Sequence, residues 1–227
     1  MPQLIRSPEN NDMTFMQHRD KTVCLTGHRT EKFLDAPIGD EAITINTIRS
    51  ILTMMLADAY DRGARYFIIG MARGVDLWAG EELLYMKRVL PDVHIIAAVP
   101  HMGHEHSIHG TDADIMYSIG EAADAVICVS ENYSSWCFLR RNDYMLRNSS
   151  AVLGVIHKDE GGTAYTLKNA VKYGVKKRVA DVTDYHRMIP LMERYPQVYR
   201  MTMPSQRYAF WEYRPRLLYQ CGLFSQE

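Results

Sequence analysis

The chain has 227 residues, of which 47% are hydrophobic, and its formal net charge at pH 7 is −1. This length can bury a sizeable core in one domain with an appendage, and the near-neutral charge argues against a protein that is held to nucleic acid mainly by a positive field. No apolar run is long enough to span a bilayer and the start is too polar for a signal peptide, so we expect a cytoplasmic protein with no membrane partner.

Short apolar runs along the chain predict the strands. They are TVCLT at 22–26, YFIIG at 66–70, VHIIAAV at 93–99, AVICVS at 125–130 and AVLGVIH at 151–157. Each run is continuous and of strand length, as expected when helices cover both faces of a parallel sheet.

Helical patterns lie between these strands. Apolar residues recur at helical spacing over 43–59, ahead of Gly63, and further helices are predicted over 74–90, 112–122, 139–147 and 163–173. The alternation of strands and helices predicts an α/β fold with an open, doubly wound, mostly parallel sheet and helices on both faces. We expect residues 21–181 to form this domain, with a loosely ordered leader at 1–20 and a C-terminal extension at 182–227.

The segment IIGMARGVDLWAGE, residues 68–81, joins the second predicted strand to a helix. An apolar strand that ends in glycines before a helix allows the backbone to approach a phosphate. In the alternative interpretation, Gly70 relieves a tight turn, Gly74 lets helix and sheet pack closely, and Asp76 caps the first helical turn. The glycine pair alone does not separate these two interpretations.

Four motifs of the chain occur in an order and at a spacing typical of a known family. They are TGHR at 26–29, GMARGVDLWAGE at 70–81, RRNDYML at 140–146 and GGTAYTLKNA at 161–170. With these motifs the chain resembles the bacterial YpsA-like proteins of the SLOG superfamily, which also includes the DNA-processing protein DprA and the lonely-guy phosphoribohydrolases. Four matched motifs are more specific than one glycine-rich loop. The resemblance implies a Rossmann-like fold and a nucleotide-type ligand.

Residues of these motifs are the candidate ligand-binding residues. His28 and Arg29 offer hydrogen-bond donors to an anionic or heteroaromatic ligand, although Arg29 could equally pair with a surface carboxylate. The amides of Gly161 and Gly162 and the hydroxyl of Thr163 open a helix, whose positive end favours a phosphate. The full set of candidates is Gly27, His28, Arg29, Gly70, Arg73, Gly74, Asp76, Arg141, Asn142, Gly161, Gly162 and Thr163.

Two carboxylates are candidate catalytic residues if the protein is an enzyme. Glu81 or Asp76 could stabilise an oxocarbenium-like transition state while Arg141 holds a phosphate. The lonely-guy enzymes carry a catalytic glutamate shortly after the glycine-rich turn, whereas this chain continues there with Ala164–Leu167. This departure from the family pattern counts against phosphoribohydrolase activity.

A histidine-rich loop, HMGHEHSIHG at 101–110, follows the third predicted strand. Its imidazoles could ligate zinc or nickel, or act as acid and base near neutral pH. We favour a polar loop without a metal, because cysteine or carboxylate partners are not evident in the sequence. The candidate metal ligands are His101, His104, His106 and His109.

Beyond Asp181 the sequence is rich in Tyr, Arg, Met and Pro. Interleaved aromatic and arginine residues can stack on single-stranded nucleic acid or occupy a protein interface. Because Glu193 and Glu212 dilute the charge, we expect an extension that packs on the domain or on a partner subunit of a homo-oligomer.

The function expected from these residues is the binding of a nucleotide or nucleotide-derived ligand, such as an NAD or ADP-ribose derivative, in a glycine-lined crevice at the C-terminal edge of the sheet. The role would be sensing or sequestering, with no cofactor firmly implied. The alternatives are N-glycosidic cleavage of nucleoside monophosphates and DprA-like binding of single-stranded DNA, against which the neutral charge counts.

Overall fold

In the computed structural model, the described residues are 4, 8–34, 41–184, 188–199 and 209–212. Their strands form one sheet in the order β4-β3-β2-β1-β5-β6, and each neighbouring pair is parallel. The fold is therefore the expected α/β, Rossmann-like sheet. The strands are β1 (Thr22–Gly27), β2 (Tyr66–Ile69), β3 (His94–Val99), β4 (Ala125–Cys128), β5 (Ala151–Ile156) and β6 (Lys176–Asp181).

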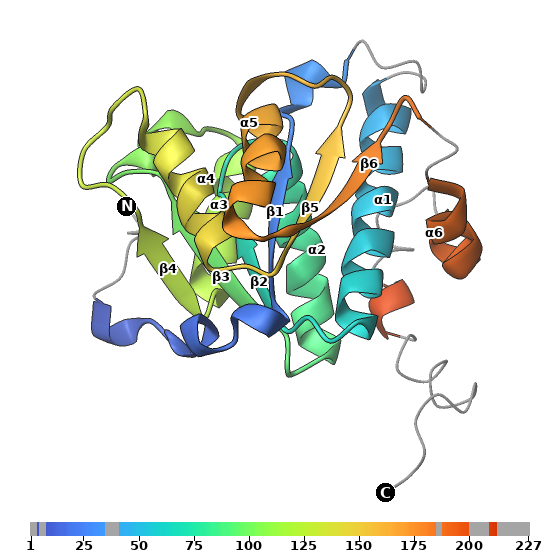
Figure 1. Ribbon diagram of the computed structural model, residues 1–227, viewed down its shortest axis with the longest axis horizontal. Helices are drawn as coiled ribbons and strands as arrows, with labels where there is room; N and C mark the ends of the chain where they lie inside the picture. Colours follow the sequence, from blue (N-terminus) through green and yellow to red (C-terminus); the bar gives the residue numbers. More distant parts are fainter. Residues whose placement is uncertain (1–3, 5–7, 35–40, 185–187, 200–208, 213–227) are drawn as a thin grey trace, which may run out of the picture.

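Helices cover both faces of the sheet, as the sequence predicts (Figure 1). On one face α1 packs against α2 and α2 against α3, and on the other α4 packs against α5. Each layer buries its own hydrophobic cluster against the strands. The helices are α1 (Glu41–Asp61), α2 (Val75–Val89), α3 (Thr111–Ala122), α4 (Cys137–Arg147) and α5 (Gly161–Asn169).

The connection order reverses between β1 and β5. From β1 the chain moves outward through β2, β3 and β4, and it then returns through α4 to place β5 on the other side of β1. The segments that follow β1 and β5 consequently diverge at the carboxyl edge of the sheet, where ligands of open parallel sheets bind.

Strand β6 was missed by the sequence analysis. Its first two residues, Lys176 and Lys177, are exposed and Arg178 is half-buried, so no continuous apolar run marks it. β6 pairs with β5 alone among the described strands, and charged residues are common on such edge strands because they discourage pairing with other chains.

Residues 8–20, most of the described part of the expected leader, pack against the domain. Residues 8–21 form three short 3₁₀ turns (Pro8–Asn10, Thr14–Gln17 and Arg19–Lys21) that bury Phe15 in the same cluster as α4 and α5. The Asn11 carboxamide oxygen accepts a hydrogen bond from the Val126 amide at 2.7 Å. The Arg19 guanidinium donates to the Tyr173 carbonyl at 2.7 Å. These contacts hold the described residues 11–19 against the domain.

The described part of the C-terminal extension packs on the domain. Helices α6 (Ile189–Arg194) and α7 (Pro196–Tyr199) lie against α1, and Trp211 is fully buried, with its indole N–H 3.4 Å from a carboxylate oxygen of Glu82 on α2. Arg178 and Arg194 both donate to the Asp58 carboxylate of α1, which ties β6 and α6 to the same helix. Within the described residues, no helix combines the length and the hydropathy that crossing a membrane requires.

Candidate functional site

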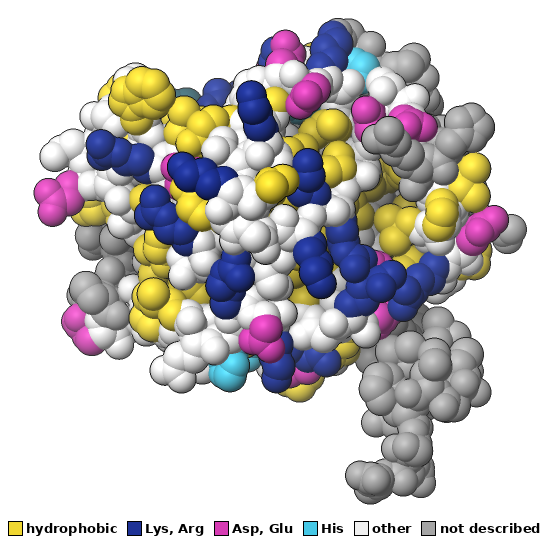
Figure 2. Space-filling model, viewed as in Figure 1, with side chains coloured by type: hydrophobic (Ala, Val, Ile, Leu, Met, Phe, Trp, Pro, Cys, Tyr) yellow, Lys and Arg dark blue, Asp and Glu magenta, His cyan; other side chains and the backbone are white. Residues whose placement is uncertain are grey.

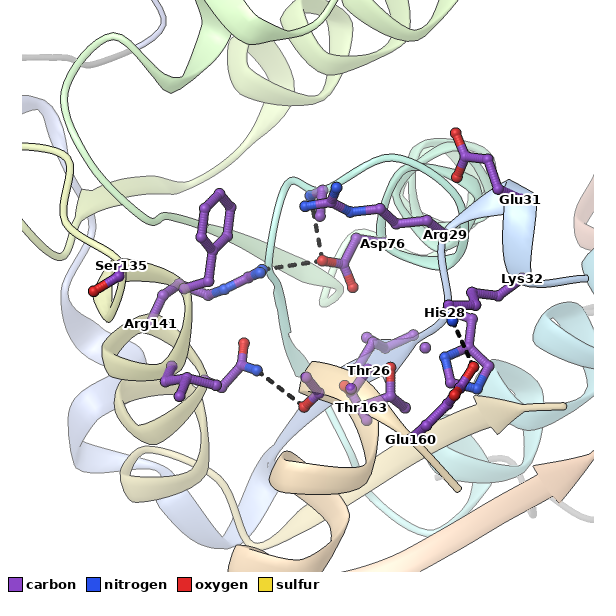
Figure 3. A pocket seen from close by; sticks show the side chains of 18 residues that line it. Thr26, His28, Arg29, Glu31, Lys32, Asp76, Ser135, Arg141, Glu160 and Thr163 are labelled. Atoms are coloured by element: carbon purple, nitrogen blue, oxygen red, sulfur yellow. Dashed lines mark hydrogen bonds and ion pairs between the residues drawn. The ribbon is translucent and has the colours of Figure 1, made fainter. Parts of the chain in front are cut away.

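A cavity of about 560 Å³ opens at the carboxyl edge of the sheet, between the segments that follow β1 and β5 (Figure 3). It brings together nine of the predicted ligand-binding residues and leaves out three, Gly70, Arg73 and Gly74. The nine are Gly27, His28, Arg29, Asp76, Arg141, Asn142, Gly161, Gly162 and Thr163.

A buried ion pair forms the floor of this cavity. Arg141 of α4 donates from Nη1 to Oδ2 of Asp76 at the start of α2, at 3.0 Å, and the side chains are only 6% and 8% exposed. Burial raises the pKa of the Asp76 carboxyl, and the neighbouring Arg141 guanidinium opposes that rise. The Arg141 Nε is buried without a hydrogen-bond partner among the described residues.

The glycines of GMARGVD make room for protein atoms. A Cβ on Gly70 would lie 1.2 Å from the Arg141 Nη1, so the missing side chain is the space that the guanidinium occupies. Gly74 has φ of +82°, and a Cβ there would lie 2.6 Å from the His28 carbonyl oxygen. Of the two interpretations left open by the sequence, close packing therefore describes both glycines. Asp76 lies two residues after Gly74, which is the N-cap of α2, and its carboxylate accepts from the Ala72 amide at 3.2 Å.

The start of α5 forms one wall of the cavity. Glu160 is the N-cap residue, and its side chain makes no capping hydrogen bond. The Asn142 amide donates to the Gly162 carbonyl at 3.3 Å, which holds this turn against α4. The amides of Gly162 and Thr163 thus belong to a helix start without a side-chain cap, a site at which backbone N–H groups favour an anion.

The two arginines predicted as ligand contacts have different surroundings. Arg73 lies outside the cavity, where it pairs with Glu31 at 2.9 Å and with Asp112 at 2.8 Å. Arg29 lines the cavity, and its guanidinium lies 5.9 Å from the centre of the Phe138 ring. Among the described residues the Arg29 guanidinium forms no hydrogen bond and no ion pair, so its donors are available to a ligand.

Two residues that the sequence analysis did not name close the cavity on the α5 side. Lys32, in the short turn after β1, pairs with Glu160 at 2.5 Å. The adjacent His28 ring donates from Nε2 to the Lys158 carbonyl at 2.7 Å, and burial lowers its pKa. Together these bonds join the segments that follow β1 and β5. No sequence signal marks Lys32 or Glu160, because they approach each other only when β5 lies beside β1.

Glu81, a catalytic candidate, does not line the cavity. It lies farther along α2, where its carboxylate accepts from Arg49 of α1 at 2.6 Å. Of the two catalytic candidates, Asp76 is therefore the one that lines the cavity.

The histidine-rich loop supports the cavity from behind. His104 is buried, and its Nε2 donates at 3.0 Å to the carbonyl of Met71, a residue with the left-handed φ of +58°. Burial lowers the pKa of His104 to about 4. His101 is half-buried, whereas His106 and His109 are exposed. Over the part of the chain that the structure describes, no group of His, Cys, Asp and Glu is arranged to hold a metal ion.

Comparisons with known proteins place the chain among bacterial relatives. The profile of the YspA SLOG family matches residues 23–185. The UPF0398 protein BH1768 of Halalkalibacterium halodurans is 25% identical over 155 residues, which cover 67% of this chain and 81% of the relative.

Two solved structures are also similar to this chain. DNA processing protein A from Helicobacter pylori aligns with a TM-score of 0.49 and 19% identity, over 83% of each chain. DNA processing protein A from Streptococcus pneumoniae aligns with a TM-score of 0.46 and 15% identity, over 81% of this chain and 59% of that one.

Substitutions at the buried ion pair are expected to be coupled. Asp76→Asn or Arg141→Gln leaves one buried partner uncompensated, so each should lower the free energy of unfolding by about 3 kcal/mol or more. The double variant should lose at least about 1 kcal/mol less than the sum of the single losses. Urea unfolding of the four proteins measures this cycle. Strict additivity would mean that the two side chains do not stabilise each other.

Protonation of His104 should destabilise the fold. Its pKa in the folded protein, about 4, lies below the reference value of 6.5, so its contribution is complete above pH 6.5 and is lost as the pH falls toward 4. Between pH 7 and about pH 4.5 the parent protein should lose about 2 to 3 kcal/mol more than His104→Gln, since Gln keeps a donor for the Met71 carbonyl. Urea unfolding at the two pH values is the measurement. The same pH dependence in both proteins would exclude this titration.

Proposed function

The chain belongs to the YspA SLOG family, and we propose that its cavity binds a phosphorylated, nucleotide-derived small molecule of the ADP-ribose or NAD type, in a sensing or sequestering role. The protein would act in the cytoplasm, as a homo-oligomer. The observation that carries this proposal is the unpaired Arg29 beside the uncapped start of α5, in one cavity of about 560 Å³.

The donors of this cavity are arranged for a phosphate. The α5 amides carry the positive end of the helix dipole, and Arg29 supplies a planar guanidinium suited to bidentate contact with phosphate oxygens. A phosphate would satisfy these groups together, and charge-assisted hydrogen bonds are the stronger kind.

The carboxylates of the cavity favour binding over cleavage. Those that line it are Glu31, Asp76 and Glu160, and each is already paired, with Arg73, Arg141 and Lys32 respectively. A general acid or base must reach the reacting atoms with a proton to give or accept, and a carboxylate engaged by a cation is a poor base. The rival function, N-glycosidic cleavage, would need one of these pairs to open.

Single-stranded DNA is the other alternative, since the Helicobacter pylori DNA processing protein A binds it. A polyanion is held by several cations along its backbone. Arg141 and Lys32, which line this cavity, are paired with carboxylates, so the site suits one or two phosphates of a small ligand better than a strand.

Removing the Arg29 guanidinium should weaken ligand binding without affecting the fold. We expect Arg29→Met to lower the affinity for ADP-ribose about tenfold to a hundredfold, as for a lost charge-assisted hydrogen bond, with little change in melting temperature because Arg29 is exposed. Arg88→Met is the matched control, since Arg88 is exposed near the end of α2 and does not line the cavity, so its loss should leave the affinity unchanged. Calorimetric titration is the measurement, and equal losses in both variants would argue against the assigned site.

A binding protein should not turn over a nucleotide. Incubation with adenosine monophosphate should release no free adenine above the rate in buffer, because the cavity carboxylates are paired. Chromatographic detection of adenine tests this expectation. Adenine release that disappears in Asp76→Asn, while the variant remains folded, would establish the enzymatic alternative instead.

A further inference from the structure

Exposed apolar side chains gather in the loops after β3 and β4, next to Ser135, which lines one end of the cavity; these side chains are called the rim below. Tyr133 and Trp136, in the loop between β4 and α4, are 69% and 63% exposed, and Met102, after β3, is 48% exposed. A hydrogen bond from the Met102 amide to the Ser130 carbonyl, at 3.2 Å, joins the two loops. Figure 2 shows a hydrophobic cluster over the β4–α4 loop, at the upper left. Single exposed apolar residues are ordinary, but a cluster beside a cavity indicates a contact surface.

An aromatic strip connects this rim with the interior of the cavity. Phe138 lines the cavity, the His101 ring lies edge-on to it at 6.2 Å between centroids, and Tyr133 lies edge-on to His101 at 5.3 Å. The inner end of the strip lies beside the unpaired guanidinium of Arg29. The strip therefore runs from an anion-binding group to an exposed ring.

The two ends of the cavity differ in chemistry. Figure 3 places Glu160 and Lys32 toward one end, Ser135, the residue before Trp136, toward the other, and Thr163 between them. The first end holds the uncapped start of α5, and the second adjoins the aromatic strip. A ligand that fills both ends must carry a phosphate at one end and a flat apolar group at the other.

We propose that the rim formed by Tyr133 and Trp136 is the subsite that binds the base of the ligand. The ligand is then a nucleoside diphosphate derivative that lies along the aromatic strip. This inference rests on the proposed function, because the position of the bound phosphate in the cavity determines where the base of the same ligand lies. Stacking of a base on an aromatic side chain depends on π-faces and tolerates different bases. The subsite consequently favours a base with a large stacking area, so that purine derivatives bind more tightly than pyrimidine derivatives.

Trp136 is a built-in reporter for this subsite. Trp78 is 5% exposed and Trp211 is fully buried, whereas Trp136 is 63% exposed, so acrylamide quenching of the full-length protein reports mainly on Trp136. ADP-ribose should protect Trp136 from acrylamide. Ribose 5-phosphate, which has a phosphate but no base, should bind without protecting it.

Affinities measured by calorimetry test the same subsite independently. Tyr133→Ala and Trp136→Ala should each weaken ADP-ribose binding about tenfold, in the range of a lost base-stacking contact, and should leave ribose 5-phosphate binding unchanged. Val171→Ala, which truncates an exposed apolar residue outside the cavity, is the control and should bind both compounds as the parent does.

The outcomes separate the failure of this inference from the failure of the proposed function. Binding of both compounds, with no protection of Trp136 and no loss in either rim variant, would overturn the base subsite alone. If neither compound binds the parent protein, both the proposed phosphate site and the proposed base subsite are wrong. A rim variant that changes the oligomeric state in size-exclusion chromatography, and leaves ADP-ribose affinity intact, would identify the patch as a contact between copies of the chain and would likewise overturn the inference.

Discussion

The buried ion pair between Asp76 and Arg141 is the interaction on which the site depends. Asp76 begins a helix on one face of the sheet and Arg141 lies in a helix on the other, so the pair joins the two helical layers across the carboxyl edge. Charges removed from water lose hydration that their attraction only partly offsets. The pair is therefore better understood as a constraint on geometry than as a source of net stability. It fixes the orientation of the Arg141 guanidinium beneath the cavity.

The glycines around this pair follow from the same constraint. The Arg141 guanidinium occupies the volume that a side chain on Gly70 would need, and a Cβ on Gly27 would lie 2.5 Å from Val75 at the start of α2. These glycines bring protein segments together, and the ligand meets the resulting cavity rather than the glycines of GMARGVD. The groups proposed to contact the ligand are therefore Arg29 and the start of α5, and not these glycines.

The sequence predicted the fold well wherever burial left a continuous apolar run. β1 to β5 lie within a residue or two of the predicted runs, because helices on both faces require apolar residues at successive positions. β6 was not predicted, because its exposed residues Lys176 and Lys177 interrupt the apolar run that marks the other strands. The packing of residues 8–20 was also missed, because Phe15 and Asn11 find their partners far along the chain.

The candidate site was predictable only in part, because the sequence gives residue types and not their partners. Arg29 and Arg73 were indistinguishable as candidates, and they differ only because Glu31 and Asp112 reach Arg73 in space. The aromatic strip was not predicted for a related reason. His101 and Tyr133 come from the loops after β3 and β4, and Phe138 from the start of α4, and these segments meet only when β3 and β4 pair.

The histidine-rich loop shows how the same spatial information changes a chemical interpretation. The sequence presents its imidazoles as equivalent metal candidates. In the fold, His104 is buried and donates to the backbone of the Met71 turn, and His101 belongs to the strip. Because burial keeps His104 uncharged near neutral pH, its role is structural. It holds the Met71 turn, which leads into α2 and Asp76. The histidine-rich loop thus contacts both the turn that precedes Asp76 and the aromatic strip.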